Sequence, residues 1–174
     1  IILFLYSNIL FSEPFDGLTL ITSMGGGQNN NNNQPKKSIL IDNDQNIINE
    51  WEHDTGPKSI AYLARDSVLY VPCQISADED GQGGGSTGGR FKKMSWDGEI
   101  VWNYYLPEEI CVPHHDIEVL PNGNILAICS ETKSLNEALE AGIETIDGTM
   151  TLDMIVEIEP VGTNEANIVW RWHF

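Results

Sequence analysis

The chain has few basic residues for its size. Only 9 Lys and Arg stand against 26 Asp and Glu in 174 residues, which gives a formal net charge of -17. Nucleic acids and anionic membrane surfaces attract proteins through clustered Lys and Arg, and the only such cluster here is Arg90, Lys92 and Lys93. That cluster is too small to offset the negative charge of the chain. The sequence therefore predicts no nucleic-acid partner and no membrane-bound mature protein.

Cysteine is also scarce, and its odd count excludes a complete set of disulfide pairs. Cys73 and Cys129 end two strand-like runs, and Cys111 lies in the loop before the only His-His pair. We predict a disulfide between Cys73 and Cys111 that closes this loop; the alternative is three buried thiols. The chain has no CxxC pair, so a zinc site of the usual type is not expected.

Long apolar runs are absent. The N-terminal stretch IILFLYSNILF is much shorter than the ~20 apolar residues that cross a bilayer, but it suits the apolar region of a secretory signal peptide. It lacks an initiator Met and a basic start, so we interpret residues 1–16 as a truncated signal peptide. The chain then stops at WRWHF without a turn or tail. We therefore expect residues 17–174 to be the N-terminal part of a larger secreted or periplasmic protein.

Helical periodicity is nearly absent as well, whereas short apolar runs bounded by Gly, Asn, Asp and Pro recur from Gly17 onward. This pattern is typical of an all-β protein with tight turns. One helix is expected, within Ser134 to Gly142, where Ser134 and Glu137 have the spacing of a capping box and Gly142 can end the helix.

Two hairpin sequences repeat. GPKSIAYLARDSVLYVPC, which starts at Gly56, aligns with VPHHDIEVLPNGNILAIC, which starts at Val112, so that Pro and Cys match at a constant offset of 56. Each reads as a strand, a tight turn and a strand. The turn in the second copy contains Asn122 and Gly123, which predicts a two-residue type I′ hairpin because both residues tolerate positive φ.

A second repeated unit alternates with these hairpins. Ile41 to Trp51, Met94 to Tyr104 and Ile158 to Trp172 each run as a strand, a polar turn, a pair of branched residues and an aromatic residue. Two hairpins make the four strands of a β-propeller blade, so about two and a half to three blades are predicted. A β-sandwich is the alternative, although it would not require the repeats. We expect the matched tryptophans to pack between blades.

Two short patterns are interpreted structurally. Asp42, Asp44 and Asn46 imitate the start of a calcium loop, but Ile47 and His53 stand where its glycine and glutamate would be. A hairpin turn explains these residues. His53 itself is interpreted as a surface loop residue.

The triplet His114-His115-Asp116 has no equivalent in the preceding repeat, which carries Lys58, Ser59 and Ile60 there. The repeat scaffold therefore does not require histidine. A residue at the start of an innermost blade strand faces the mouth of the central funnel, where an imidazole can hold an anion, transfer a proton or act as a nucleophile. Alternatively, the histidines merely cap the strand.

Several stretches in order, among them SILIDNDQNIINEWEHDTGP, GGRFKKMSWDGEIVWNYYLPEE and HHDIEVLPNGNILAI, resemble the secreted arylsulfotransferases, which work without PAPS. The resemblance implies a six-bladed β-propeller that transfers a sulfuryl group from an aryl sulfate to a phenol through a sulfohistidine, without a metal or other cofactor. It implies a catalytic role for His115, with His114 and Asp116 in substrate binding.

The family's His-x-Asn and Gln-His-Asp segments, the latter with the nucleophile, are expected after Phe174, so this chain alone is expected to be inactive. His173 belongs to the aromatic strand motif and is not assigned to catalysis. The alternative function is a noncatalytic secreted propeller that binds a glycan or a protein.

Overall fold

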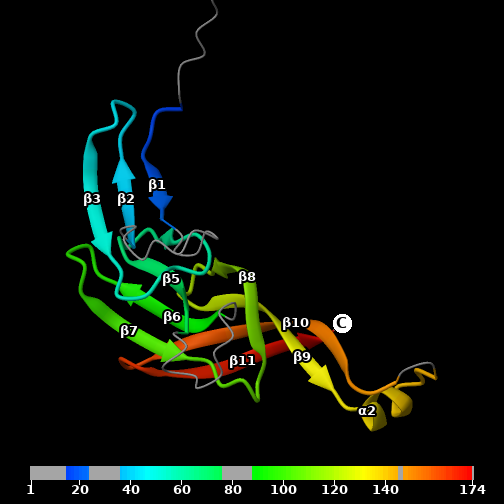
Figure 1. Ribbon diagram of the computed structural model, residues 1–174. Coiled ribbons are helices and arrows are strands. Elements are labelled where there is room, and N and C mark those ends of the chain that lie inside the picture. Colours follow the sequence, from blue (N-terminus) through cyan, green and yellow to red (C-terminus); the bar gives the residue numbers. More distant parts are fainter. Residues whose placement is uncertain (1–14, 24–35, 76–87, 145–146, 174) are drawn as a thin grey trace, which may run out of the picture.

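The computed structural model describes residues 15–23, 36–75, 88–144 and 147–173. It confirms the all-β prediction, with three antiparallel sheets that follow one another in chain order (Figure 1). Sheet A contains β1 (Thr19–Thr22), β2 (Lys37–Ile41) and β3 (Ile47–Glu52). Sheet B contains β4 (Tyr62–Leu63), β5 (Leu69–Gln74), β6 (Gly88–Met94) and β7 (Ile100–Tyr105). Sheet C contains β8 (Val112–Val119), β9 (Ile125–Lys133), β10 (Met150–Val161) and β11 (Glu165–His173).

Sheets B and C have the predicted content of a propeller blade, four consecutive strands paired in order. Each sheet packs face to face on the next. Leu40 and Trp51 of sheet A share a buried cluster with Leu69 and Val71 of sheet B. On its other face, sheet B packs against sheet C in a second buried cluster that contains Trp102.

Each of the two interfaces between the sheets contains a tryptophan that donates a hydrogen bond across it. The indole N–H of Trp51 donates to the Ser95 carbonyl of the next sheet at 2.9 Å. At the next interface, Trp102 donates to the Glu165 carbonyl at 2.8 Å, although it matches Asn49 and not Trp51 in the repeat. The prediction that tryptophans pack between blades is confirmed for these two. Trp170 occupies the repeat position of Trp102 on the outer face of sheet C, and it is 46% exposed where Trp102 is 2% exposed.

Strand pairing confirms the hairpin repeat with its offset of 56. Pro57 pairs with Cys73, and Pro113 pairs with Cys129. Leu63 with Leu69 and Val119 with Ile125 form the matching pairs next to the two turns, again 56 residues apart.

The second repeat is marked by a β-bulge in the last strand of each sheet. The register shifts so that one branched residue is left without a partner opposite it: Ile48 in β3, Val101 in β7 and Val169 in β11. A bulge at the same sequence position in each sheet aligns the aromatic residues that follow it on one face.

The predicted type I′ turn at Asn122 and Gly123 is wrong. Gly123 has a positive φ of 86°, whereas the φ of Asn122 is not positive, although a type I′ turn would require it to be. The Gly123 N–H donates to the Leu120 carbonyl, and the Leu120 N–H donates to the Asn124 carbonyl. These bonds define a three-residue loop, a type I turn followed by a left-handed residue. Pro121 explains the difference, because its fixed φ suits the first central position of a type I turn.

The inserted helix is confirmed as α2 (Leu135–Glu140). The Ser134 side chain accepts from the Glu137 N–H, and the Glu137 carboxylate accepts from the Ser134 N–H, so the predicted capping box is complete. Gly142 follows the end of the helix with a φ of 88°. The calcium-like residues also form the expected turn, in which the Asp42 carboxylate accepts from the backbone of Asp44 and Asn46.

The predicted disulfide between Cys73 and Cys111 is wrong, and the alternative of three buried thiols is confirmed. Cys73 belongs to the cluster between sheets A and B. Cys111 and Cys129 belong to the cluster between sheets B and C. Their thiols interact, and this contact together with burial raises the pKa of the Cys129 thiol.

In the part of the chain that the structure describes, no helix has the length and apolarity needed to span a membrane. The apolar run at residues 1–14, on which the signal-peptide prediction depends, lies outside the described residues. Residues 15 and 16 precede β1.

Candidate functional site at the start of β8

His114, His115 and Asp116 form a bulge near the start of β8. The strand pairs with β9 at Pro113 and again at Ile117, so that this triplet stands opposite the single residue Ile128. A bulge redirects side chains out of the regular alternation of a strand. The segment that leads into β4 has the same irregularity, between the bridge at Pro57 and the pairing of Tyr62. The bulge therefore belongs to the repeat, and only sheet C has histidines on it.

His115 has an unusual backbone conformation, with a φ of 60°. A non-glycine residue in the left-handed region is uncommon and stores strain of about 1–3 kcal/mol, which persists where the surrounding structure requires it. The side chain of His115 is exposed. The bulge therefore presents an accessible imidazole from a backbone conformation that a regular strand would not adopt.

His114 is half-buried beside His115, and the two rings meet edge to face with their centroids 5.0 Å apart. Its Nε2 lies 3.2 Å from Oδ1 of Asp153 on β10. Its Nδ1 is buried and has no hydrogen-bond partner within the described part of the chain. The Asp153 carboxylate thus orients the ring of His114 through Nε2, while Nδ1 can still form a hydrogen bond.

Asp116 is held by the neighbouring sheet. Its Oδ1 accepts from the Ser59 hydroxyl at 2.9 Å, and its Oδ2 accepts from the Tyr62 hydroxyl at 2.6 Å. Oδ1 also accepts from the Ile117 N–H at 2.9 Å. The carboxylate therefore joins the first strands of sheets B and C at the bulge.

A small hollow beside the histidines also contains Lys58, Gly88 and Gly89. Lys58 occupies the repeat position of His114, one sheet earlier in the chain. A Cβ atom added at Gly88 would lie 3.3 Å from the Pro113 carbonyl and 3.4 Å from Cγ of Lys58. Glycine therefore allows the lysine stem and the start of β8 to approach β6. Lys58 brings a positive charge to the site.

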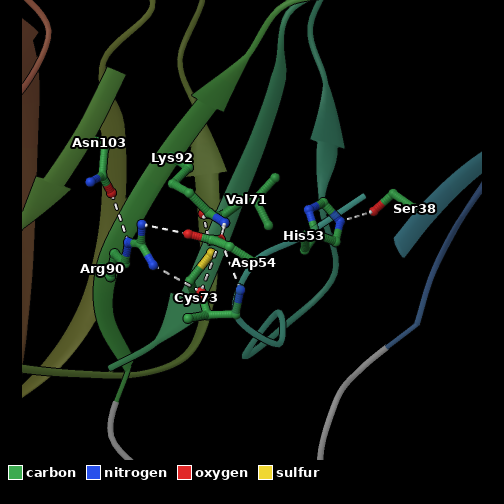
Figure 2. A network of polar contacts seen from close by, with 9 residues as sticks. Ser38, His53, Asp54, Val71, Cys73, Arg90, Lys92 and Asn103 are labelled. Atoms are coloured by element: carbon green, nitrogen blue, oxygen red, sulfur yellow. Dashed lines mark hydrogen bonds and ion pairs between the residues drawn. The ribbon is translucent and has the colours of Figure 1, made fainter. Parts of the chain in front are cut away.

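A second polar cluster lies between sheets A and B (Figure 2). The Asp54 carboxylate, in the segment after β3, forms ion pairs with Arg90 at 2.9 Å and with Lys92. Arg90 also donates to Asn103 at 2.7 Å and to Thr55 at 3.1 Å. Lys92 is 0% exposed. Burial raises the pKa of Asp54, but the hydrogen bond and charge of the Lys92 ammonium, together with the charge of the Arg90 guanidinium, hold that pKa below its usual range. The basic cluster noted in the sequence is thus largely internal.

The interpretation of His53 as a surface residue is wrong, because its side chain is 7% exposed. Its Nε2 lies 2.9 Å from the Ser38 hydroxyl (Figure 2). Burial, and then the charge of Lys92, lower the pKa of His53 to about 4, so its imidazole is neutral near pH 7. The sequence shows a histidine in a polar segment and does not reveal that this segment folds onto sheet B.

The two clusters differ in what they can do. In the cluster of Figure 2, the Asp54, Arg90 and Lys92 side chains bind one another between two sheets. At the bulge, an exposed imidazole, a second imidazole and a lysine line one hollow. Lysine and histidine side chains can bind an anion, and imidazoles can also move protons near neutral pH. The repeat alignment identified the histidines, but it did not identify Ser59 and Tyr62 as partners of Asp116.

Three consecutive antiparallel sheets, with a histidine pair on the first strand of the third, define a repeat protein of the propeller-blade type. The chain belongs to the arylsulfotransferase family, since the family model described as Arylsulfotransferase (ASST) matches residues 12–174. The comparison with curated proteins finds no match. Membership confirms the family predicted from the sequence and supports a sulfotransferase type of function.

Proposed function

We propose that the His114–His115 bulge forms one wall of the active site of an aryl-sulfate sulfotransferase. The observation that carries the proposal is the exposed side chain of His115, whose strained backbone lies on the first strand of a blade-like sheet. In a propeller this strand is innermost. The substrates would be an aryl sulfate as donor and a phenol as acceptor, and the protein would act outside the cytoplasm.

In the proposed reaction, an imidazole nitrogen attacks the sulfur of the aryl sulfate, and the sulfur–oxygen bond to the aryl group breaks. The phenolate leaves with the bonding electron pair. The hydroxyl of the acceptor phenol then attacks sulfur, gives its proton to a base, and releases the imidazole. Such covalent catalysis divides one difficult displacement into two easier steps. The attacking histidine is expected in a segment after Phe174.

His115 would donate an N–H to a sulfuryl oxygen during both displacements, because donors aimed at developing charge stabilise the transition state. His114, oriented by Asp153, and Lys58 would bind the same anionic group. The formal charge of -17 repels anions at long range, so positive groups concentrated at the site are needed. Lys58 supplies one of them.

The test is turnover of 4-nitrophenyl sulfate by the natural polypeptide that carries this chain together with the His-x-Asn and Gln-His-Asp segments. We expect 4-nitrophenol release that depends on added phenol, with an equal amount of phenyl sulfate formed and no requirement for PAPS. Release without an acceptor product would indicate hydrolysis rather than transfer. A noncatalytic propeller that binds a glycan or a protein would give neither product.

A further inference from the structure

The carboxylate of Asp116 is directed toward other residues of the protein. Its two carboxylate oxygens accept hydrogen bonds from Ser59, Tyr62 and the Ile117 backbone, at 2.6 to 2.9 Å. Ser59 and Tyr62 lie 57 and 54 residues earlier in the chain, at the start of sheet B. Hydrogen bonds to an ionised acceptor are roughly twice as strong as those between neutral groups. Asp116 is therefore a link between two sheets.

This link lies directly next to the strained residue. His115 precedes Asp116 and has a φ of 60°, a conformation that persists only where its surroundings fix it. On the other side of the bulge, β8 pairs with β9 through Pro113. The chain is thus fixed at Pro113 and at Asp116, and the two histidines project from the segment between these points.

We propose that Tyr62 is a positioning residue for His115, acting through the carboxylate of Asp116. This inference rests on the proposed function and deepens it. It also replaces the predicted role of Asp116 in substrate binding by a role in holding the bulge. The Tyr62 hydroxyl donates to Oδ2, the oxygen that the Ser59 and Ile117 bonds leave open. Without that bond, the carboxylate can turn about its side chain and the bulge can relax.

Tyr62 is suited to a constant role as a donor. Burial raises the pKa of its hydroxyl to about 12, and the hydrogen bond to Asp116 contributes in the same direction. The Tyr62 hydroxyl therefore keeps its proton throughout the pH range in which a sulfotransferase would work. Phenylalanine is a suitable replacement because it retains the ring and removes only the donor.

The experiment is a double-mutant cycle in the same polypeptide and turnover assay. We expect Tyr62→Phe to lower kcat about tenfold, as the loss of one hydrogen bond to a charged group allows, with KM changed less than about twofold because substrate binding is retained. In the His115→Ala background, Tyr62→Phe should change the residual rate by less than about twofold. The matched control is Tyr70→Phe, since Tyr70 pairs with Tyr62 across β4 and β5 and should leave the rate unchanged.

A purely structural tyrosine would behave differently. An equal loss in both backgrounds would overturn the inference, and so would an unchanged kcat for Tyr62→Phe. If Tyr62→Phe fails to fold by circular dichroism, Ser59→Ala removes the neighbouring donor in a smaller substitution and is taken through the same cycle. The proposed function fails separately, through a fully active His115→Ala variant or a parent protein without transferase activity.

Discussion

Replacing His115 by alanine should lower the rate of sulfuryl transfer by about 100- to 1000-fold, the usual effect of removing one donor from a transition-state site. His115 is exposed and projects from the bulge, so the loss should come from chemistry and not from folding. The rate is measured as release of 4-nitrophenol from 4-nitrophenyl sulfate with phenol as acceptor.

Two matched variants separate chemistry from backbone strain. Glycine adopts positive φ without a steric penalty, so His115→Gly should fold at least as stably as His115→Ala and be equally slow. His173 is a second exposed histidine, and its Nδ1 lies 2.6 Å from Glu131; His173→Ala should retain the parent rate. Activity of His115→Ala close to that of the parent would show that the site has been assigned to the wrong residue.

The second large effect is on stability. Asp54→Ala should destabilise the chain by about 3 kcal/mol, because removal of one partner leaves an uncompensated buried charge. Lys92 is completely buried between sheets A and B, and Asp54 is its ion-pair partner. Chemical denaturation, followed by far-ultraviolet circular dichroism, measures the change as a lower midpoint.

The control variant removes the buried charge of Lys92 instead of its partner Asp54. Lys92 occupies the repeat position of Val156, which is fully buried between sheets B and C. Because a buried ion pair can be replaced by apolar residues at little or no cost, Lys92→Met should be close to neutral, and it should rescue most of the loss in Asp54→Ala. Equal destabilisation by the two single variants would contradict this account of the cluster.

Repetition is what made the fold predictable from the sequence. Pro57 and Cys73 match Pro113 and Cys129 in sequence, and the two pairs oppose each other in the structure. The capping residues Ser134 and Glu137 likewise act within one turn of chain. Such features depend on contacts that are local or repeated, so a single sequence is sufficient to find them.

One error is local, at the turn of Asn122 and Gly123, where Pro121 favours a type I geometry. The other errors concern contacts between sheets. Sequence spacing cannot tell that Cys73 faces sheet A while Cys111 faces sheet C, because these positions follow from how three sheets stack. For the same reason His53 was misinterpreted, since the next residue, Asp54, ties this segment to sheet B through Arg90 and Lys92. In the sequence, Tyr62 does not differ from other aromatic residues in strands. Only the bulge of the next sheet makes it a partner of Asp116.

The central claim is that an aryl sulfate contacts the imidazoles of the bulge, and ring resonances of the four histidines test it most directly. Long-range proton–nitrogen spectra are recorded while 4-nitrophenyl sulfate is added. We predict shifts for His115 and His114, with the buried His53 and the Glu131-bound His173 unchanged. Shifts confined to His173, or an unperturbed His115 at saturating ligand, would contradict the claim.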